Sequence, residues 1–276
     1  MSQNQWNCTG NIPVWEQAGL DCSAAVRMKG HVRILGELMP DVLGGQEVNK
    51  EMQMELIFGC MDAGLPYTLI WGNMTPIVYR ADKLELVDAK YLLYPEKVEE
   101  YEGSFNDVRS KSCSIAVFRT KEDGRIFVFA TTHLWWKNGS DPTSSEYQKG
   151  SDEVRLMQVR MASDSIRALQ EKYSCPAILV GDLNARYDSP AVQYALGEGG
   201  FLHAHDIAAE TTEDIGYNGC GWRGPGKWID APFVEAIDHI LLRGIPAQNV
   251  QRFARYRSDE YLYLSDHAPV YTDIVL

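Results

Sequence analysis

The stretch Ala177-Ile178-Leu179-Val180-Gly181-Asp182-Leu183-Asn184 (AILVGDLN) joins a short apolar run directly to a group of turn-forming polar residues. An apolar run that is rich in branched side chains and ends at a glycine predicts a buried β-strand. The Asp182 carboxylate and the Asn184 carboxamide would then lie at the edge of a sheet, where functional residues are often placed. Asp and Asn also suit simple turns, so this segment alone does not indicate a function.

Four further junctions in the sequence place a carboxylate, an imidazole or an amide beside an apolar strand. They are Gln46-Glu47, Thr132-His133, Ile237-Asp238-His239-Ile240 and Ser265-Asp266-His267-Ala268-Pro269-Val270. Taken singly, a glutamate at a strand end is often only solvated, and a histidine such as His239 is more simply a packing residue. Together, the five junctions predict an active site assembled from several strand ends.

The remaining pattern predicts an α/β sandwich with mixed sheets, as a single domain spanning residues 1–276. Helical periodicity predicts helices at residues 24–38 and 152–172 and a short helix after Pro190. Apolar runs predict strands at residues 77–80, 84–92, 113–119, 126–132, 237–242 and 270–275. Some neighbouring strands are joined by hairpin turns and others by helices, which favours mixed sheets over a barrel of regular βα units. Residues 210–232 predict a long surface loop.

The charge balance limits the class of binding partner. The 276 residues include 26 Lys and Arg against 38 Asp and Glu, a formal net charge of −12. Tight, non-specific binding to duplex DNA requires many basic contacts to phosphates, so this charge disfavours it. A phosphate-containing substrate stays compatible, because a bound divalent cation reverses the local field.

The cysteines and the first residues bear on the cellular compartment. The six cysteines form no CxxC pair and have no zinc-ligand spacing with a histidine, so free thiols are the expectation. Residues 1–10 contain no basic start followed by an apolar run, and no apolar window is long enough for a transmembrane helix. The expectation is a cytoplasmic location, with secretion as the alternative if a signal peptide has been removed.

In their order along the chain, the segments QE, TH, GDLN, IDH and SDHAPV resemble the endonuclease/exonuclease/phosphatase superfamily. The resemblance covers residues 7–276, and GDLN and SDHAPV are its most specific parts. It implies a four-layer α/β sandwich, in which two mixed β-sheets pack face to face between outer helices. It also implies an enzyme that hydrolyses phosphoester bonds with Mg²⁺, or with Mn²⁺ in its place. The expected partner is then a phosphorylated small molecule or a nucleotide, and the expected protein is a monomer.

The resemblance implies a metal site built from Glu47, Asn7 and Asp266. Glu47 would be the principal ligand and Asp266 a second one. Asn7 would match the asparagine of the family's first strand and lie next to the metal. Mg²⁺ is usually held by one or two carboxylates, with water and substrate phosphate completing its shell. Because Asn7 lies so close to the first residue, that strand would be shortened, or replaced by the tag-like residues 1–5.

The same resemblance implies that His267, Asp238, Asp182, His133 and Asn184 carry the reaction. His267 would be the essential histidine, and Asp238 would accept a hydrogen bond from its ring and fix its orientation. Asp182 would orient or deprotonate the attacking water. Asn184 and His133 would donate hydrogen bonds to phosphoryl oxygens, and His133 would add positive charge if protonated. Whether His267 or Asp182 takes the proton of the water stays open.

Tryptophans near these segments are candidates for lining the substrate cleft. Trp135 follows His133 closely and Trp222 precedes Asp238, and a Trp face stacks on a base, a sugar or a cation. Packing inside the protein is the alternative for one member of the Trp135-Trp136 pair. Lys111 could contact a phosphate, although a solvated surface residue is the simpler interpretation.

Two other functions stay open at this point. One is a nuclease that acts on single-stranded nucleic acid. The other is a non-catalytic binding or scaffold protein on the same fold, because a fold does not fix a function.

Overall fold

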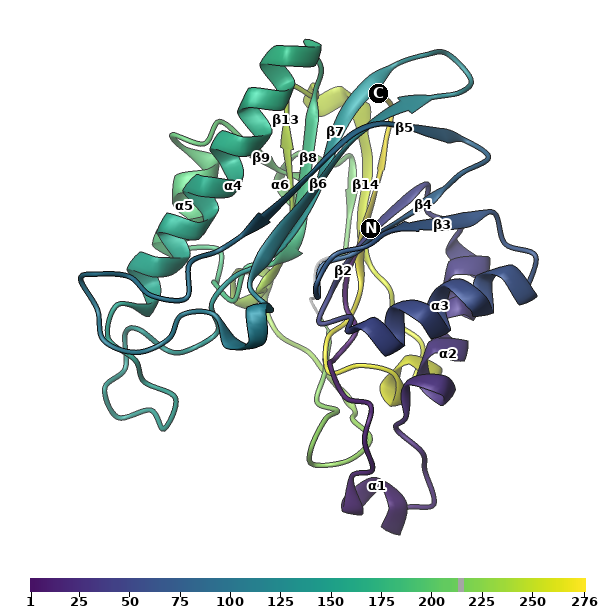
Figure 1. Cartoon of the computed structure of the whole chain (residues 1–276), viewed down its shortest axis with the longest axis vertical. Helices are drawn as coiled ribbons and strands as arrows, with labels where there is room; N and C mark the ends of the chain where they lie inside the picture. Colours follow the sequence, from purple (N-terminus) through teal and green to yellow (C-terminus); the bar gives the residue numbers. More distant parts are fainter. Residues whose placement is uncertain (213–215) are drawn as a thin grey trace.

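Two mixed β-sheets pack face to face between outer helices in the computed structural model, which describes residues 1–212 and 216–276 (Figure 1). The seven-stranded sheet contains, in spatial order, β10 (Glu210–Thr211), β14 (Val250–Arg255), β15 (Val270–Ile274), β1 (Ser2–Asn4), β2 (Val42–Gln46), β4 (Ile77–Arg80) and β3 (Tyr67–Ile70). The six-stranded sheet contains β5 (Leu84–Leu93), β6 (Ser112–Thr120), β7 (Ile126–His133), β8 (Ala177–Asp182), β13 (Asp238–Arg243) and β9 (Leu202–His203). The predicted four-layer α/β sandwich is confirmed.

Helices cover the outer face of each sheet. In Figure 1, α2 (Ala24–Leu38) and α3 (Lys50–Asp62) lie on the seven-stranded side, and α4 (Ser151–Tyr173) and α5 (Pro190–Leu196) on the six-stranded side. The short helix α1 (Pro13–Gln17) projects from the body at the bottom of the view, and α6 (Ala204–Ile207) follows β9. The 3₁₀ turns are Asp107–Arg109, Phe233–Glu235, Ala247–Asn249 and Asp259–Tyr263. Across the two described ranges, no helix has the length and apolar character needed to cross a membrane.

Alternation along the strands distributes apolar side chains between separate cores. In β6, Ile115 and Val117 belong to the core beneath α4, whereas Ala116 and Phe118 belong to the core between the sheets. Phe118 meets Tyr79 of the opposite sheet with 4.7 Å between ring centroids. This middle core fixes the distance between the sheets, and so the distance between side chains at their edges.

Local sequence signals explain where the helices begin and end. The Asn49 side chain accepts a hydrogen bond from the Met52 amide at 3.0 Å and so caps the start of α3. The predicted helices at residues 24–38 and 152–172 are confirmed as α2 and α4, to within one residue at each end. The sequence pattern did not reveal α3, because apolar residues occur on both of its faces: Met52 is buried, whereas Phe58 is exposed.

The first strand corrects one expectation. Residues 1–5 are not a tag, because Ser2–Asn4 forms β1, which runs parallel to β2 and antiparallel to β15 in the interior of the seven-stranded sheet. The N-terminal ammonium group donates to the Val42 carbonyl at 3.1 Å. The asparagine of the first strand is therefore Asn4, and Asn7 lies beyond the end of the strand.

The stretch predicted as a long loop at residues 210–232 is largely irregular. It contributes β10 to the edge of the large sheet and forms a separate two-stranded ribbon of β11 (Tyr217–Asn218) and β12 (Trp228–Ile229). Part of the predicted loop, residues 213–215, lies outside the described residues.

Glycines permit close approach of the backbone to neighbouring strands at two places in the sandwich, Gly44 and Gly181. A Cβ atom on Gly44 of β2 would lie 2.6 Å from Thr131 Cβ and 2.6 Å from Val180 Cγ2, both in the opposite sheet. Gly181 has φ +153°, and a Cβ there would lie 2.0 Å from the Thr132 carbonyl oxygen. Gly181 of the GDLN motif is thus required by the contact between β7 and β8.

We predict that Gly44→Ala destabilises the protein by about 1–3 kcal/mol, because the added methyl group overpacks the space between the sheets. The matched control is Gly36→Ala in α2, where the new Cβ would meet only the Leu65 side chain, at 3.6 Å. That change should stabilise the helix by up to about 1 kcal/mol. Urea unfolding of both variants measures the difference, and equal stability of Gly44→Ala and the parent protein would refute the close-approach argument.

Candidate active site

Strand register brings three of the predicted site residues into one row. β7 and β8 run parallel with His133 opposite Asp182, and β13 runs antiparallel to β8 with Asp238 opposite Asp182. Glu47 directly follows β2 of the other sheet, and the Asp266-His267 pair lies in the loop before β15. Both sheets therefore contribute to one cluster of side chains at one edge of the sandwich.

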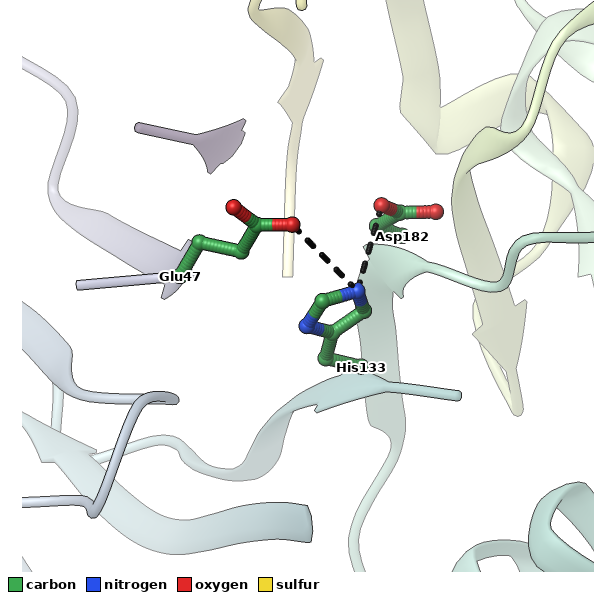
Figure 2. Close-up of side chains that lie close together, drawn as sticks. All are labelled: Glu47, His133 and Asp182. Atoms are coloured by element: carbon green, nitrogen blue, oxygen red, sulfur yellow. Dashed lines mark ion pairs between the residues drawn. The ribbon is translucent and has the colours of Figure 1, made fainter. Parts of the chain in front are cut away.

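His133 lies between Glu47 and Asp182 (Figure 2). Its Nε2 atom is 3.8 Å from Glu47 Oε1 and 3.4 Å from Asp182 Oδ2. Lys111 is buried beside it, with Nζ 2.8 Å from the same Nε2. Burial lowers the pKa of His133 well below its ordinary value, and the charges of Lys111 and His267 lower it further. The ring is thus neutral, and a charged His133, which the sequence left open, is disfavoured.

Lys111 supplies the positive charge in this part of the site. Burial lowers the pKa of its ammonium group to about 8, although the carboxylates of Glu47 and Asp182 partly offset that effect. It lies in a cavity of about 310 Å³ with Glu47, His133 and Asp182. The simpler interpretation from sequence, a solvated surface lysine, is therefore wrong. In the sequence, the one sign that Lys111 lies at the edge of the sheet was its position immediately before a predicted strand.

The buried Asp182 carboxylate is held by hydrogen bonds from two directions. Asn4 Nδ2 donates to Asp182 Oδ2 at 3.0 Å, and the Asn184 backbone amide donates to Asp182 Oδ1 at 2.8 Å. Burial raises the pKa of Asp182 to about 6, against the opposing effect of the nearby His267 charge. Asn184 has φ +47°, and its side-chain Nδ2 donates to the Leu134 carbonyl at 3.1 Å.

Asn4, and not Asn7, is the asparagine that reaches the centre of the cluster. Asn7 is exposed, and its backbone amide donates to Glu47 Oε2 at 3.0 Å. Its side-chain Oδ1 accepts a hydrogen bond from Asn49 Nδ2 at 2.7 Å. The prediction that Asn7 is the family's first-strand asparagine is therefore corrected to Asn4. The prediction assumed that the first strand includes Asn7, whereas the strand ends at Asn4.

His267 and Asp238 form a close pair next to Asp182. His267 Nδ1 is 2.7 Å from Asp238 Oδ2, and His267 Nε2 is 3.8 Å from Asp182 Oδ2. Burial alone would lower the pKa of His267. The hydrogen-bonded Asp238 carboxylate, together with Asp182 and Asp266, instead raises that pKa well above its ordinary value. These carboxylates favour the protonated ring, whose Nδ1–H donates to Asp238.

The carboxylates of Asp266 and Glu47, near this pair, are candidate ligands for a hard cation such as Mg²⁺. Asp266 Oδ1 is buried and has no hydrogen-bond partner among the described residues. Burial raises the pKa of Asp266, and the Glu47 carboxylate raises it further, against the effect of His267. Ligand atoms of Glu47, His133 and Asp182 also lie within 4.8 Å of one another. The carboxylate oxygens of Glu47, Asp182 and Asp266 are of the type that Mg²⁺ prefers, whereas the His133 nitrogen is not.

A buried arginine joins the segment before Asp266 to the segment that follows β1. Arg27 of α2 donates from one guanidinium nitrogen to the carbonyls of Gln5 at 2.8 Å and Leu264 at 2.6 Å. It also donates to the carbonyls of Trp6, Cys8 and Cys22. Arg27 therefore ties the segment after β1 to the segment before Asp266, a role that no sequence pattern announced.

The tryptophan that lines the cavity is not one of the two that the sequence predicted. Trp135 is 1% exposed and packs against Phe105 and Val154, so its assignment to the substrate cleft is wrong. Its neighbour Trp136 is 39% exposed and lines the cavity, with Nε1 donating to Asp107 Oδ2 at 3.0 Å. Trp222 is 70% exposed and meets the edge of the Trp6 ring, outside the residues that line the cavity. Trp135 and Trp136 are consecutive residues just after β7, and consecutive side chains of an extended chain point to opposite sides. This alternation was the sequence signal that one of the two is buried and the other is exposed.

The sequence profile of the Endonuclease/Exonuclease/phosphatase family matches residues 23–267. The chain belongs to this family. No curated protein gives a significant sequence match. The fold relationship extends over whole chains of solved family members, at low sequence identity.

Three solved structures show the extent of this similarity. The mannosyl-6-phosphatase of Bacteroides thetaiotaomicron is 20% identical, with a TM-score of 0.72 over 100% of this chain and 98% of that one. TDP2 of D. rerio, complexed with single strand DNA product, is 19% identical, with a TM-score of 0.61 and 95% coverage of both chains. The human Nocturnin catalytic domain is 15% identical, with a TM-score of 0.57 over 97% of this chain and 93% of that one.

We predict opposite outcomes for the two adjacent tryptophans. Trp135→Ala should lower the free energy of unfolding by about 3–5 kcal/mol, because it leaves a large cavity in a packed cluster. Trp136→Ala should change it by less than about 1 kcal/mol, because much of that side chain already faces solvent. Denaturant unfolding of the two variants tests this, and similar losses for both would contradict the assigned burial.

Proposed function

We propose that this family member is a metal-dependent phosphoric ester hydrolase that acts on a small phosphorylated molecule or a nucleotide. The observation that carries the proposal is the His267–Asp238 pair, whose second ring nitrogen faces the buried Asp182 carboxylate at 3.8 Å. Family membership supports the class of reaction, since the family is named for enzymes that cleave phosphoester bonds.

Charge in the cluster supports a requirement for a divalent cation. Glu47, Asp182, Asp238 and Asp266 supply four negative charges when ionised, against two positive charges from Lys111 and His267. The cluster would then carry a net charge of −2, which one Mg²⁺ or Mn²⁺ ion would offset. Glu47 and Asp266 would hold the ion, and Asn7 would contribute through the backbone amide that orients Glu47. When bound, the ion supplies charge compensation at the phosphoryl oxygens.

The protonation states support separate roles for Asp182 and His267. A carboxyl group with a pKa of about 6 is mostly ionised at neutral pH and is a better base than an ordinary aspartate. His267 already carries its proton, so it serves as a hydrogen-bond donor to a phosphoryl oxygen. In this scheme Asp182 takes the proton of the attacking water, the new bond forms at phosphorus, and the bond to the leaving oxygen breaks. That oxygen is protonated by solvent.

The remaining polar groups would hold the phosphoryl group in place. Lys111 supplies a charged donor and the side chain of Asn184 a neutral one. His133 would donate from Nε2 once Lys111 Nζ, 2.8 Å from that atom, turns to the phosphoryl group instead. Such preorganised donors stabilise the charge that builds up in the transition state. Trp136, at the rim of the same cavity, offers a ring face for a base or a sugar.

The size of the cavity and the net charge favour a small substrate. A space of about 310 Å³ suits a phosphorylated metabolite or a single nucleotide. Among the similar structures, one is a mannosyl-6-phosphatase, which supports a phosphomonoester. The alternative of single-stranded nucleic acid is supported by the likeness to TDP2 in complex with a single strand DNA product.

Hydrolysis of p-nitrophenyl phosphate and bis-(p-nitrophenyl) phosphate with Mg²⁺ tests the proposal. We expect turnover that EDTA abolishes and that His267→Ala lowers by about 10²–10⁴-fold. His31→Gln is the matched control, because this buried histidine of α2 bonds Gln3 and none of the side chains of the cluster, and it should leave turnover near normal. Preference for the monoester indicates a phosphatase, and preference for the diester indicates a nuclease or phospholipase. Undiminished turnover in His267→Ala refutes the proposed site.

A binding measurement separates catalysis from metal capture. Mg²⁺ should raise the thermal unfolding midpoint of the parent protein and should raise it less in Glu47→Gln. A folded protein that binds Mg²⁺ through Glu47 but hydrolyses neither ester would favour the non-catalytic binding protein.

We also predict that Lys111→Met lowers kcat by about 10²-fold, because it removes a buried positive charge from the phosphoryl site. Arg109→Met, two residues away in a 3₁₀ turn, is the control for a nearby surface cation. Steady-state kinetics on the preferred ester compares the two. A Lys111→Met enzyme with normal kcat and KM would exclude contact of this lysine with the reacting group.

A further inference from the structure

Two buried histidines lie behind the catalytic edge of the six-stranded sheet. His239 follows Asp238 in β13, and His203 ends the neighbouring strand β9. Both side chains are almost wholly inaccessible. Neither takes part in the reaction proposed above, so their burial needs its own explanation, since burying an unsatisfied imidazole is costly.

The two rings form a hydrogen-bonded chain that ends at the turn after β8. The His205 backbone amide donates to His203 Nδ1 at 3.1 Å. His203 Nε2 lies 3.0 Å from His239 Nδ1, and His239 Nε2 lies 2.8 Å from the Ala185 carbonyl oxygen. Ala185 immediately follows Asn184 of the GDLN motif.

The ends of this chain fix the direction of every bond in it. A backbone amide can only donate, so His203 Nδ1 must accept, and a neutral His203 then carries its proton on Nε2. His239 accepts that bond at Nδ1 and therefore carries its own proton on Nε2, from which it donates to the Ala185 carbonyl. Burial lowers the pKa of His239 to about 4 and that of His203 well below its ordinary value, which agrees with two neutral rings.

The turn that receives this bond carries Asp182 and Asn184. Its backbone is held at one end by the Asn184 amide, which donates to Asp182 Oδ1 at 2.8 Å. The Leu183 amide donates to the Ile237 carbonyl, next to Asp238, at 2.9 Å. Asn184 has a left-handed backbone, with φ +47°, which asparagine adopts more readily than most residues other than glycine. The hydrogen bonds to Asp182 and to the Ile237 carbonyl hold the turn in this conformation.

We propose that His239 is a positioning residue for hydrolysis, which holds the Asp182–Ala185 turn in register with Asp238 through the hydrogen-bonded chain from His203 to the Ala185 carbonyl. This inference rests on the proposed function. Consecutive residues of a strand point to opposite faces, so β13 directs Asp238 toward His267 and His239 toward the turn. One strand thereby sets the positions of both His267 and Asp182.

Two substitutions at one position test the role. His239→Phe keeps a ring but removes both hydrogen bonds, whereas His239→Gln keeps an amide donor for the Ala185 carbonyl. We expect His239→Phe to lower kcat by about 10–100-fold with little change in KM, and His239→Gln to recover most of that loss. His31→Phe is the control for removing a buried histidine that does not touch the turn, and should leave kcat near the parent value.

Unfolding midpoints show that the compared variants are folded under the assay conditions. Equal kcat values for the folded Phe and Gln variants, or a loss that appears mainly in KM, would overturn the positioning role.

Nitrogen-15 NMR of the histidine rings at neutral pH provides a readout that does not depend on activity. We expect His203 and His239 both to be neutral, with the proton on Nε2. A proton on Nδ1 of either ring, or a charged ring, would overturn the hydrogen-bonded chain even in an active enzyme. The absence of hydrolysis by the parent protein, with both rings in the expected form, would instead refute the proposed function and leave the chain as a purely structural device.

Discussion

The buried carboxylate of Asp182 is the group around which the rest of the site is arranged. A carboxylate removed from water costs several kcal/mol unless hydrogen bonds and opposite charges offset the loss of solvation. Asn4 meets this demand from the seven-stranded sheet, and the Asn184 amide meets it from the turn after β8. The Asn4–Asp182 bond thus crosses between the two sheets and requires them to lie close together at this edge. The absence of a side chain at Gly44 allows that approach.

Burial also separates the protonation states of groups that have similar pKa values in water. The imidazole of His133 is kept neutral by burial and by nearby positive charge, whereas that of His267 is kept charged by its hydrogen bond to Asp238. Two histidines in one cluster therefore offer different chemistry. Lys111 keeps a positive charge near neutral pH because the surrounding carboxylates partly offset its burial. Such a division of roles arises from the surroundings of each group and not from its residue type.

Support for the site comes from residues that do not enter it. Arg27 connects the carbonyls of Gln5 and Leu264, and its guanidinium lies over the Trp6 ring at 4.9 Å. His239 reaches the turn after β8 from the opposite face of β13. Both residues are buried and polar, and both donate to backbone carbonyls. Fixed backbone at strand ends is what a site assembled from several loops requires.

The amino-acid sequence alone predicted the mixed α/β sandwich, the helices α2, α4 and α5, and the five junctions where polar groups adjoin apolar strands. These features are local: periodicity, turn residues and short motifs such as GDLN record them directly in neighbouring residues. The packing of the chain was needed to identify Asn4 in place of Asn7, to show which of Trp135 and Trp136 is buried, and to show that Lys111 is not solvated. Each of those choices depends on which side chains the packing of two sheets encloses, and that enclosure joins residues far apart in the chain. The charge on His267 and the raised pKa of Asp182 follow from the same enclosure, because desolvation and neighbouring charges exist only once the sheets have met.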